Sequence, residues 1–223
     1  MSKFSEDLQK LLGKHQPKEV EELNLDEFDN NIKSFDNNYK EGLELYNNLI
    51  HLSLNNIGLE NLSNFPEIKC LMILSLKNNK LKGDDFDILP KLYPNLYKLK
   101  ISFNQIESID KLSCLNQFQL KKIEVKENPF TKNDNEYRDK IYKMLPSLEI
   151  VDQMQKNGQE IDTSDYGNDS SSFEEEEEED DNDNNEEDSE ESDGKDVDSK
   201  ESEDDFNEEN EDDEGGKKKR KNK

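Results

Sequence analysis

Residues 71–81, with the sequence LMILSLKNNKL, decide the fold of this chain. They fit the pattern L-x-x-L-x-L-x-x-N-x-L, in which apolar residues alternate as in a strand before an asparagine marks a turn. The pattern returns at residues 49–59 (LIHLSLNNIGL), 96–106 (LYKLKISFNQI) and 120–130 (LKKIEVKENPF), and a shorter copy, VEELNL, begins at Val20. The copies begin 22 to 29 residues apart, which indicates a repeat architecture.

Each fixed position of the pattern has a physical role. Alternation in the strand points one set of side chains into a shared core; these are Leu52, Leu54, Leu74, Leu76, Leu99, Ile101, Ile123 and Val125. Asn79, Asn104 and Asn128 can each donate to and accept from backbone groups at the turn, so stacked repeats would form an asparagine ladder. Ile57 occupies the same position in the second copy and leaves that ladder incomplete.

Apolar residues between and beyond the strands predict the rest of the solenoid. Those between strands have helical or 3₁₀ spacing: Leu62 and Phe65; Phe86, Leu89 and Leu92; Ile109, Leu112 and Leu115. Solenoid ends need caps; the N-terminal candidates are Phe4, Leu8, Leu11 and Leu12 on a helix ending near Pro17, and the C-terminal ones are Tyr137, Ile141, Leu145 and Leu148. The fold predicted is an α/β leucine-rich repeat solenoid with a curved parallel sheet, a helical or 3₁₀ convex side and two caps.

The charge divides the chain into two parts. Of 223 residues, 30 are Lys or Arg and 56 are Asp or Glu, and residues 161–214 alone hold 30 acidic and 2 basic side chains. Such a segment repels itself and has little apolar surface to offset chain entropy, so it is predicted to be disordered. We predict a capping helix at 1–18, five repeats at 19–133, a C-terminal cap at 134–155, a disordered acidic region at 156–216 and a basic end at 217–223.

The chain resembles the acidic leucine-rich nuclear phosphoprotein 32 family in its opening helix, the start of the first repeat from Pro17 to Leu25, the cap sequence MLPSLEIVD at 144–152, the acidic tail and the KKKRK at 217–221. The resemblance implies residence in the nucleus, with shuttling to the cytoplasm left open. It also implies histone binding, histone-chaperone or acetylation-masking activity, and inhibition of a type 2A protein phosphatase. The alternative is a leucine-rich scaffold of a ribonucleoprotein or phosphatase complex, although 28 net negative charges would repel RNA.

The acidic segment is a weak polyanion. Its 28 net negative charges over 54 residues correspond to one charge per roughly 6.5 Å of extended chain, against one per roughly 1.7 Å in duplex DNA. It would therefore bind and shield basic histone surfaces without stripping them from intact DNA; alternatively it only solubilises the folded part. The densest block is the predicted main histone contact: Glu174, Glu175, Glu176, Glu177, Glu178, Glu179, Asp180 and Asp181.

Two further signals lie in the tail. Ser171, Ser172 and Ser202 each precede an acidic residue by three positions, a spacing typical of sites for kinases that favour acidic substrates. The basic cluster of Lys217, Lys218, Lys219, Arg220 and Lys221 suits a nuclear-import signal. The alternative for this cluster is a charge-balancing terminus.

A second surface is predicted on the repeats themselves. Residues flanking the strand leucines project from the inner curve, which we call the concave face; its predicted partner contacts are Glu22, Asp26, His51, Lys77, Lys98, Lys100, Lys122 and Lys126. The face changes from acidic to basic along the chain. The basic end is expected to attract either the protein's own tail or an acidic partner, or else to be an ordinary solvated surface.

No catalytic constellation is present in the sequence, so we expect no enzyme, cofactor or metal site. His15 and His51 lie on different predicted elements, and no phosphate-binding or nucleophile-elbow motif occurs. The run from Gly83 to Asp85 is interpreted as a turn and N-cap. Cys70 and Cys114 are expected to be reduced, buried thiols of an intracellular chain. No apolar run approaches the roughly 20 residues of a membrane span, so a membrane is not an expected partner. Nucleic acid is not expected either, because the 28 net negative charges of the acidic segment would repel phosphate.

Overall fold

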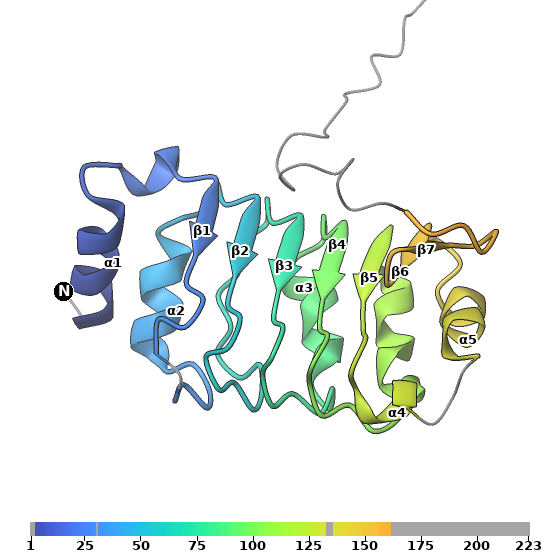
Figure 1. Ribbon diagram of the computed structural model, residues 1–223. Coiled ribbons are helices and arrows are strands. Elements are labelled where there is room, and N and C mark those ends of the chain that lie inside the picture. Colours follow the sequence, from blue (N-terminus) through green and yellow to red (C-terminus); the bar gives the residue numbers. More distant parts are fainter. Residues whose placement is uncertain (1–2, 30, 133–135, 162–223) are drawn as a thin grey trace, which may run out of the picture. The chain divides into compact units, whose positions relative to one another are not determined.

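The computed structural model describes residues 3–29, 31–132 and 136–161, which lie in one compact unit. Its strands form one sheet in chain order (Figure 1). They are β1 (Glu22–Asn24), β2 (His51–Ser53), β3 (Ile73–Ser75), β4 (Lys98–Lys100), β5 (Lys122–Glu124), β6 (Ile150–Val151) and β7 (Met154–Gln155). Neighbouring strands are parallel from β1 to β6, and the last pair, β6 and β7, is an antiparallel hairpin.

One row of apolar side chains runs through the sheet in register. Leu23, Leu52, Leu74, Leu99, Ile123 and Val151 are aligned from β1 to β6, and each is at most 3% exposed. The repeat pattern predicts Leu52, Leu74, Leu99 and Ile123 in this row; the structure adds Leu23 at one end and Val151, from the predicted C-terminal cap, at the other. Because each repeat presents the same apolar positions, stacking buries one continuous core.

Helical segments cover the side of the core opposite the strands (Figure 1). They are α2 (Asn37–Glu44), η2 (Phe86–Ile88), α3 (Leu89–Leu92) and η3 (Ile109–Gln117). Two shorter segments, η1 (Pro17–Glu19) and α4 (Pro129–Lys132), lie in connections, and α1 (Lys3–Leu12) and α5 (Tyr137–Met144) lie towards the two ends of the sheet. No helix in the described part of the chain is long and apolar enough to cross a membrane.

The sequence did not predict helix α2, which the structure contains. Asp36 caps it by accepting from the backbone N–H groups of Asn38 at 2.8 Å and Tyr39 at 3.0 Å. Leu43 is fully buried, and Gly42 lies so close to α1 that a Cβ there would come within 2.7 Å of the Phe4 ring. The tertiary contact with α1 therefore explains a helix whose asparagines and glycine are weak helix formers.

The N-terminal cap differs from the prediction in two details. The helix α1 ends at Leu12, before Pro17, because Gly13 adopts φ +66° and its N–H donates to the Gln9 carbonyl at 2.9 Å. Phe4 and Leu8 are buried, but Leu11 is 56% exposed and does not join the apolar stripe. At the other end, the predicted cap residues are all buried: Tyr137, Ile141, Leu145 and Leu148.

Two local expectations were met only in part. Asp85 occupies the N-cap position of η2, after a turn in which Gly83 adopts φ +80°, but its side chain makes no capping bond. Its carboxylate instead accepts the backbone N–H of Leu62 in the preceding repeat. Burial raises the pKa of Asp85 above its ordinary value. Cys70 is exposed and Cys114 is half-buried, so neither thiol is the buried core group expected, and both are free.

Candidate functional site

The three predicted ladder asparagines are buried at the turns that follow β3, β4 and β5. The Asn104 side chain accepts from Leu81 N–H at 3.0 Å and donates to the carbonyls of Leu76 and Ile101 at 2.9 and 3.0 Å. Asn79 and Asn128 make equivalent bonds to their own and the preceding repeat. These amides therefore hold each turn, and the strand before it, at a fixed place on the concave face.

At the N-terminal end of the concave face, a carboxylate organises neighbouring repeats. Asp26 accepts from the Ser53 hydroxyl at 2.6 Å, from Asn55 N–H at 2.8 Å and from the Asn55 amide at 2.9 Å. Asn55 in turn accepts from the Ser75 hydroxyl at 2.8 Å and from Lys77 N–H at 2.7 Å. Asp26 is therefore tied into a side-chain network that crosses three repeats.

Of the other predicted contacts at this end, Glu22 is exposed on β1, and His51 is half-buried beside it on β2. Ile73 follows them in the same row on β3 and is 7% exposed. The acidic and basic ends of the face are thus separated by an apolar side chain that the sequence reasoning did not place there.

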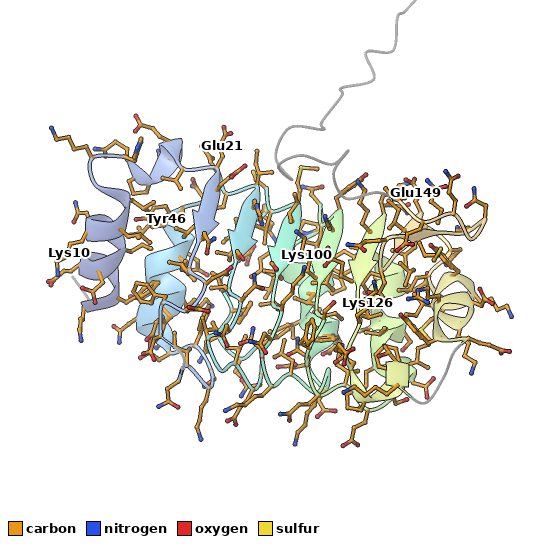
Figure 2. The ribbon with its side chains drawn as sticks, viewed as in Figure 1. Lys10, Glu21, Tyr46, Lys100, Lys126 and Glu149 are labelled. Atoms are coloured by element: carbon orange, nitrogen blue, oxygen red, sulfur yellow. The ribbon has the colours of Figure 1, made fainter. Side chains whose placement is uncertain are left out.

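The C-terminal end of the concave face is rich in lysine. Figure 2 shows Lys100 and Lys126 on the strand side of the unit. Glu124 lies among the lysines and pairs with Lys77 at 2.5 Å and with Lys98 at 3.8 Å. We call Lys77, Lys98, Lys100, Lys122 and Lys126 the lysine patch. Together with Glu124, these five lysines carry a formal charge of +4, and the buried Asp152 carboxylate accepts the Lys126 backbone N–H at 3.0 Å.

A depression of about 630 Å³ lies at the N-terminal end, between α1, the turn after β1 and the start of α2. Its walls combine carboxylates with aromatic rings: Asp7, Glu27, Asp29 and Asp36 with Phe4, Phe28 and Tyr39, beside Lys3 and Asn38. The rings pack together, since the Phe4 centroid lies 5.6 Å from that of Phe28 and 4.7 Å from that of Tyr39. We call this hollow the acidic depression.

The charges in the acidic depression act on one another. Burial, together with the carboxylates of Asp29 and Asp36, raises the pKa of Tyr39. Carboxylates beside aromatic faces form an environment that favours a cationic side chain. Sequence reasoning missed the depression, because its residues come from three segments; the acidic run through Asp26, Glu27 and Asp29 was the available signal.

Several predicted sites lie outside the described residues, and they remain predictions. They are the acidic block 174–181, the serines Ser171, Ser172 and Ser202, and the basic cluster 217–221. Within the described residues, no group of three or more His, Cys, Asp or Glu side chains could hold a metal ion.

The period near 24 residues, the parallel sheet in chain order and the asparagine turns define a leucine-rich repeat protein. The chain is also similar to proteins named as acidic leucine-rich nuclear phosphoprotein 32 family members or related proteins, which are 31–36% identical to it over about half of its length. No protein-family model matches the chain.

Three relatives illustrate the range of sequence identity and coverage. A phosphoprotein 32-related protein 1 of Caenorhabditis elegans is 36% identical over 118 residues, which are 52% of this chain and 51% of that protein. A related protein of Plasmodium falciparum is 34% identical over 128 residues, 56% of this chain and 45% of that one. A protein of Tetrahymena thermophila that is named as a histone is 35% identical over 141 residues, 63% of this chain and 34% of that one. The chain therefore spans between a third and about half of these relatives.

Solved structures give weaker likenesses. The Drosophila melanogaster SNF/U2A' complex contains a chain that is 24% identical, with a TM-score of 0.49 over 65% of this chain and 76% of that chain. An internalin from Listeria monocytogenes is 18% identical, with a TM-score of 0.42 over 66% of this chain and 54% of its own.

Proposed function

We propose that this protein is a non-catalytic nuclear protein that binds histones through its acidic segment and acts as a histone chaperone or chromatin regulator. The observation that carries the proposal is the run of 28 net negative charges over 54 residues, attached to a leucine-rich repeat unit. The names of the relatives, nuclear phosphoproteins and one histone, support it. The basic cluster at 217–221 is the proposed import signal, and the three tail serines are proposed phosphorylation sites.

The repeat unit contributes a second contact in this proposal. The acidic depression offers four carboxylates and three aromatic rings at one place, which suits the lysine or arginine side chain of a basic partner. The lysine patch would repel such a partner. Histones are therefore expected to contact the acidic segment and the N-terminal end of the unit, away from β4 and β5.

Inhibition of a type 2A protein phosphatase is proposed only as an accompanying activity. It rests on the family resemblance, and no residue of the described unit is assigned to it. An inhibitory assay with the purified chain and the phosphatase catalytic subunit tests it directly, and unchanged phosphatase activity at micromolar protein would remove it.

The test of the main proposal compares histone binding by the full chain with that of a chain ending at Asp162, across a salt series. Loss of retention by the shortened chain is expected, because it lacks almost the whole polyanion. Binding by the full chain should weaken steeply from about 0.15 to about 1 M salt, as the Debye length falls from about 8 to about 3 Å. Equal histone retention by the two proteins would contradict the proposal.

A second comparison separates the dense block from total charge. Residues 174–181 are replaced by their amides, Glu→Gln and Asp→Asn. The matched control replaces eight other acidic residues in the same way: Glu201, Glu203, Asp204, Asp205, Glu208, Glu209, Glu211 and Asp212. If the block is the main contact, only the first variant loses most of its histone affinity; equal losses would assign binding to overall charge.

A further inference from the structure

We infer that the lysine patch is the docking surface for the beginning of this chain's own acidic segment, which histones must displace. The contact can be measured in the absence of histones, so its failure is distinguishable from failure of the proposed function. Three features support the inference: where the described chain ends, the charge of the surface at that point, and the sequence that follows.

The chain leaves the described unit on the concave face. After the β6–β7 hairpin, Glu160 bridges back to Met154, and Ile161 N–H donates to the Gln153 carbonyl at 2.8 Å. Ile161 then lines a small pocket together with residues of β4, β5 and β6, among them Lys98 and Lys122. The last described residue is therefore held beside the lysine patch.

The residues that follow have the opposite charge to the patch. Asp162, Asp165 and Asp169 come first, and the dense block begins at Glu174, 13 positions after Ile161. Adjacent strands lie about 4.8 Å apart, so the patch extends about 10 Å from β5 to β3. Thirteen residues can span up to roughly 43 Å. The acidic segment can therefore reach every lysine of the patch without strain.

The patch is basic by composition, and its lysines have partners. Lys77 and Lys98 pair with Glu124, Lys122 lies 5.4 Å from the centre of the Tyr97 ring, and Lys98, Lys100 and Lys122 make other interactions as well. Five lysines and one glutamate give these side chains a formal charge of +4. The sign of that charge favours an acidic occupant over a basic one.

Because the acidic segment is tethered to the unit, even a weak contact with the lysine patch is populated, yet a stronger partner can displace it. A segment joined by a short flexible link has an effective concentration in the millimolar range at its own docking site. Each exposed ion pair multiplies an equilibrium constant by only about twofold. A free acidic protein would compete poorly with the tethered segment, whereas a histone carrying many more positive charges would take the segment away. The lysine patch thus competes with histones for the acidic segment. A basic protein binds the segment only if its affinity exceeds that of the patch.

Zero-length carbodiimide cross-linking of the full chain, read by mass spectrometry, tests the contact. We expect cross-links in low salt from Lys98, Lys100, Lys122 or Lys126 to acidic residues between 162 and 181, and their loss in about 1 M salt. An equal mixture of ¹⁴N- and ¹⁵N-labelled protein separates contacts within one chain from contacts between chains. Absence of these cross-links, equal yields from Lys14, Lys82 and Lys143, or cross-links only between chains would overturn the inference.

Histone affinity gives a second readout. Replacing Lys100, Lys122 and Lys126 by Gln should strengthen histone binding roughly eightfold in low salt, since three pairs of about twofold each are lost. The matched control, Lys14, Lys82 and Lys143→Gln, changes the net charge equally at exposed positions elsewhere and should have a smaller effect. Arg at the three patch positions should restore the wild-type affinity. Equal gains in both Gln variants, or no gain in the patch variant, would refute the competition.

Discussion

The two ends of the concave face use charge differently. At the N-terminal end, the Asp26 carboxylate accepts hydrogen bonds from Ser53 and Asn55, so its charge organises the neighbouring repeat. At the C-terminal end, Asp152 accepts from the backbone N–H groups of Val125 and Lys126 in a similar way, whereas Glu124 lies among five lysines and pairs with two of them, Lys77 and Lys98. Hydrogen bonding to backbone N–H groups therefore separates structural charge from surface charge on the repeats.

The largest expected effect comes from removing one member of the asparagine ladder, which lies at the turns after β3, β4 and β5. Asn104→Ala leaves the buried Leu81 N–H without its acceptor. The carbonyls of Leu76, Ile101 and Ser102 each lose one donor and keep another, from Asn79, Asn128 and the Asn78 N–H. A buried unpaired group costs about 1–3 kcal/mol, so we expect a loss of about 3 kcal/mol in urea unfolding. Gln105→Ala, at the exposed neighbouring position, should stay within about 0.5 kcal/mol. Equal stability of the two variants would show that the ladder does not hold the turns.

The next prediction tests whether the charge of Asp26 is structural, by its contribution to the free energy of unfolding. Asp26→Ala removes the acceptor of Asn55 N–H and of the Ser53 hydroxyl, and it should destabilise the protein by about 2 kcal/mol. Glu22→Ala, an exposed carboxylate on the same face, is the control and should change unfolding by less than about 0.5 kcal/mol. A similar small change in both variants would mean that the Asp26 network carries no stability.

A third prediction concerns the cap of α2, which forms one wall of the acidic depression. Asp36→Ala should cost about 1 kcal/mol at neutral pH, whereas Asp36→Asn should cost little, because Asn caps about as well as Asp. The bond from Tyr39 N–H lowers the pKa of Asp36. Its stabilising contribution is therefore present above the unfolded-state pKa of about 3.9 and is lost as the pH falls through the lower folded-state pKa.

The pH dependence of the free energy of unfolding tests the role of the Asp36 cap. Urea unfolding at about pH 7 and at about pH 2 should show a stability difference between wild type and Asp36→Ala that shrinks in acid. A difference that grew in acid would have the wrong sign for a carboxylate whose pKa is lowered by folding.

The smallest effect concerns the lysine-rich end. Glu124→Gln removes the charged partner of Lys77 and Lys98; the three side chains are 15–34% exposed, and surface pairs are worth about 0–1 kcal/mol. Unfolding should therefore change by less than about 1 kcal/mol, while the patch gains one net positive charge. More cross-links between the patch and residues 162–181 are expected in this variant. Fewer cross-links would indicate that Glu124 positions the lysines instead of neutralising them.

Repetition made the sheet predictable. The alternating leucines define strand, core side and register at once, because every repeat must bury the same row of side chains. The asparagine positions followed from the same template. The helix α2 did not, since asparagines and a glycine give it no helical signal, and its stability depends on Leu43 and Gly42 packing near Phe4.

Contacts between residues of different repeats could not be predicted from the sequence, for a related reason. Asp85 was expected to cap its own helix but binds Leu62 N–H in the preceding repeat, 23 positions earlier. The acidic depression joins α1, the turn after β1 and the start of α2. Partners so distant in sequence meet only when the stacking distance and the turn geometry are both fixed.

Residue order specifies the repeat, the core row and the charge division, because periodicity and net charge can be counted along the chain. Packing in three dimensions specifies which carboxylates accept hydrogen bonds from neighbouring repeats and where Ile161 lies. Ile161 lies beside Lys98 and Lys122 because the β6–β7 hairpin turns the chain back over the concave face. Such proximity depends on packing in three dimensions, which the order of residues along one repeat does not contain.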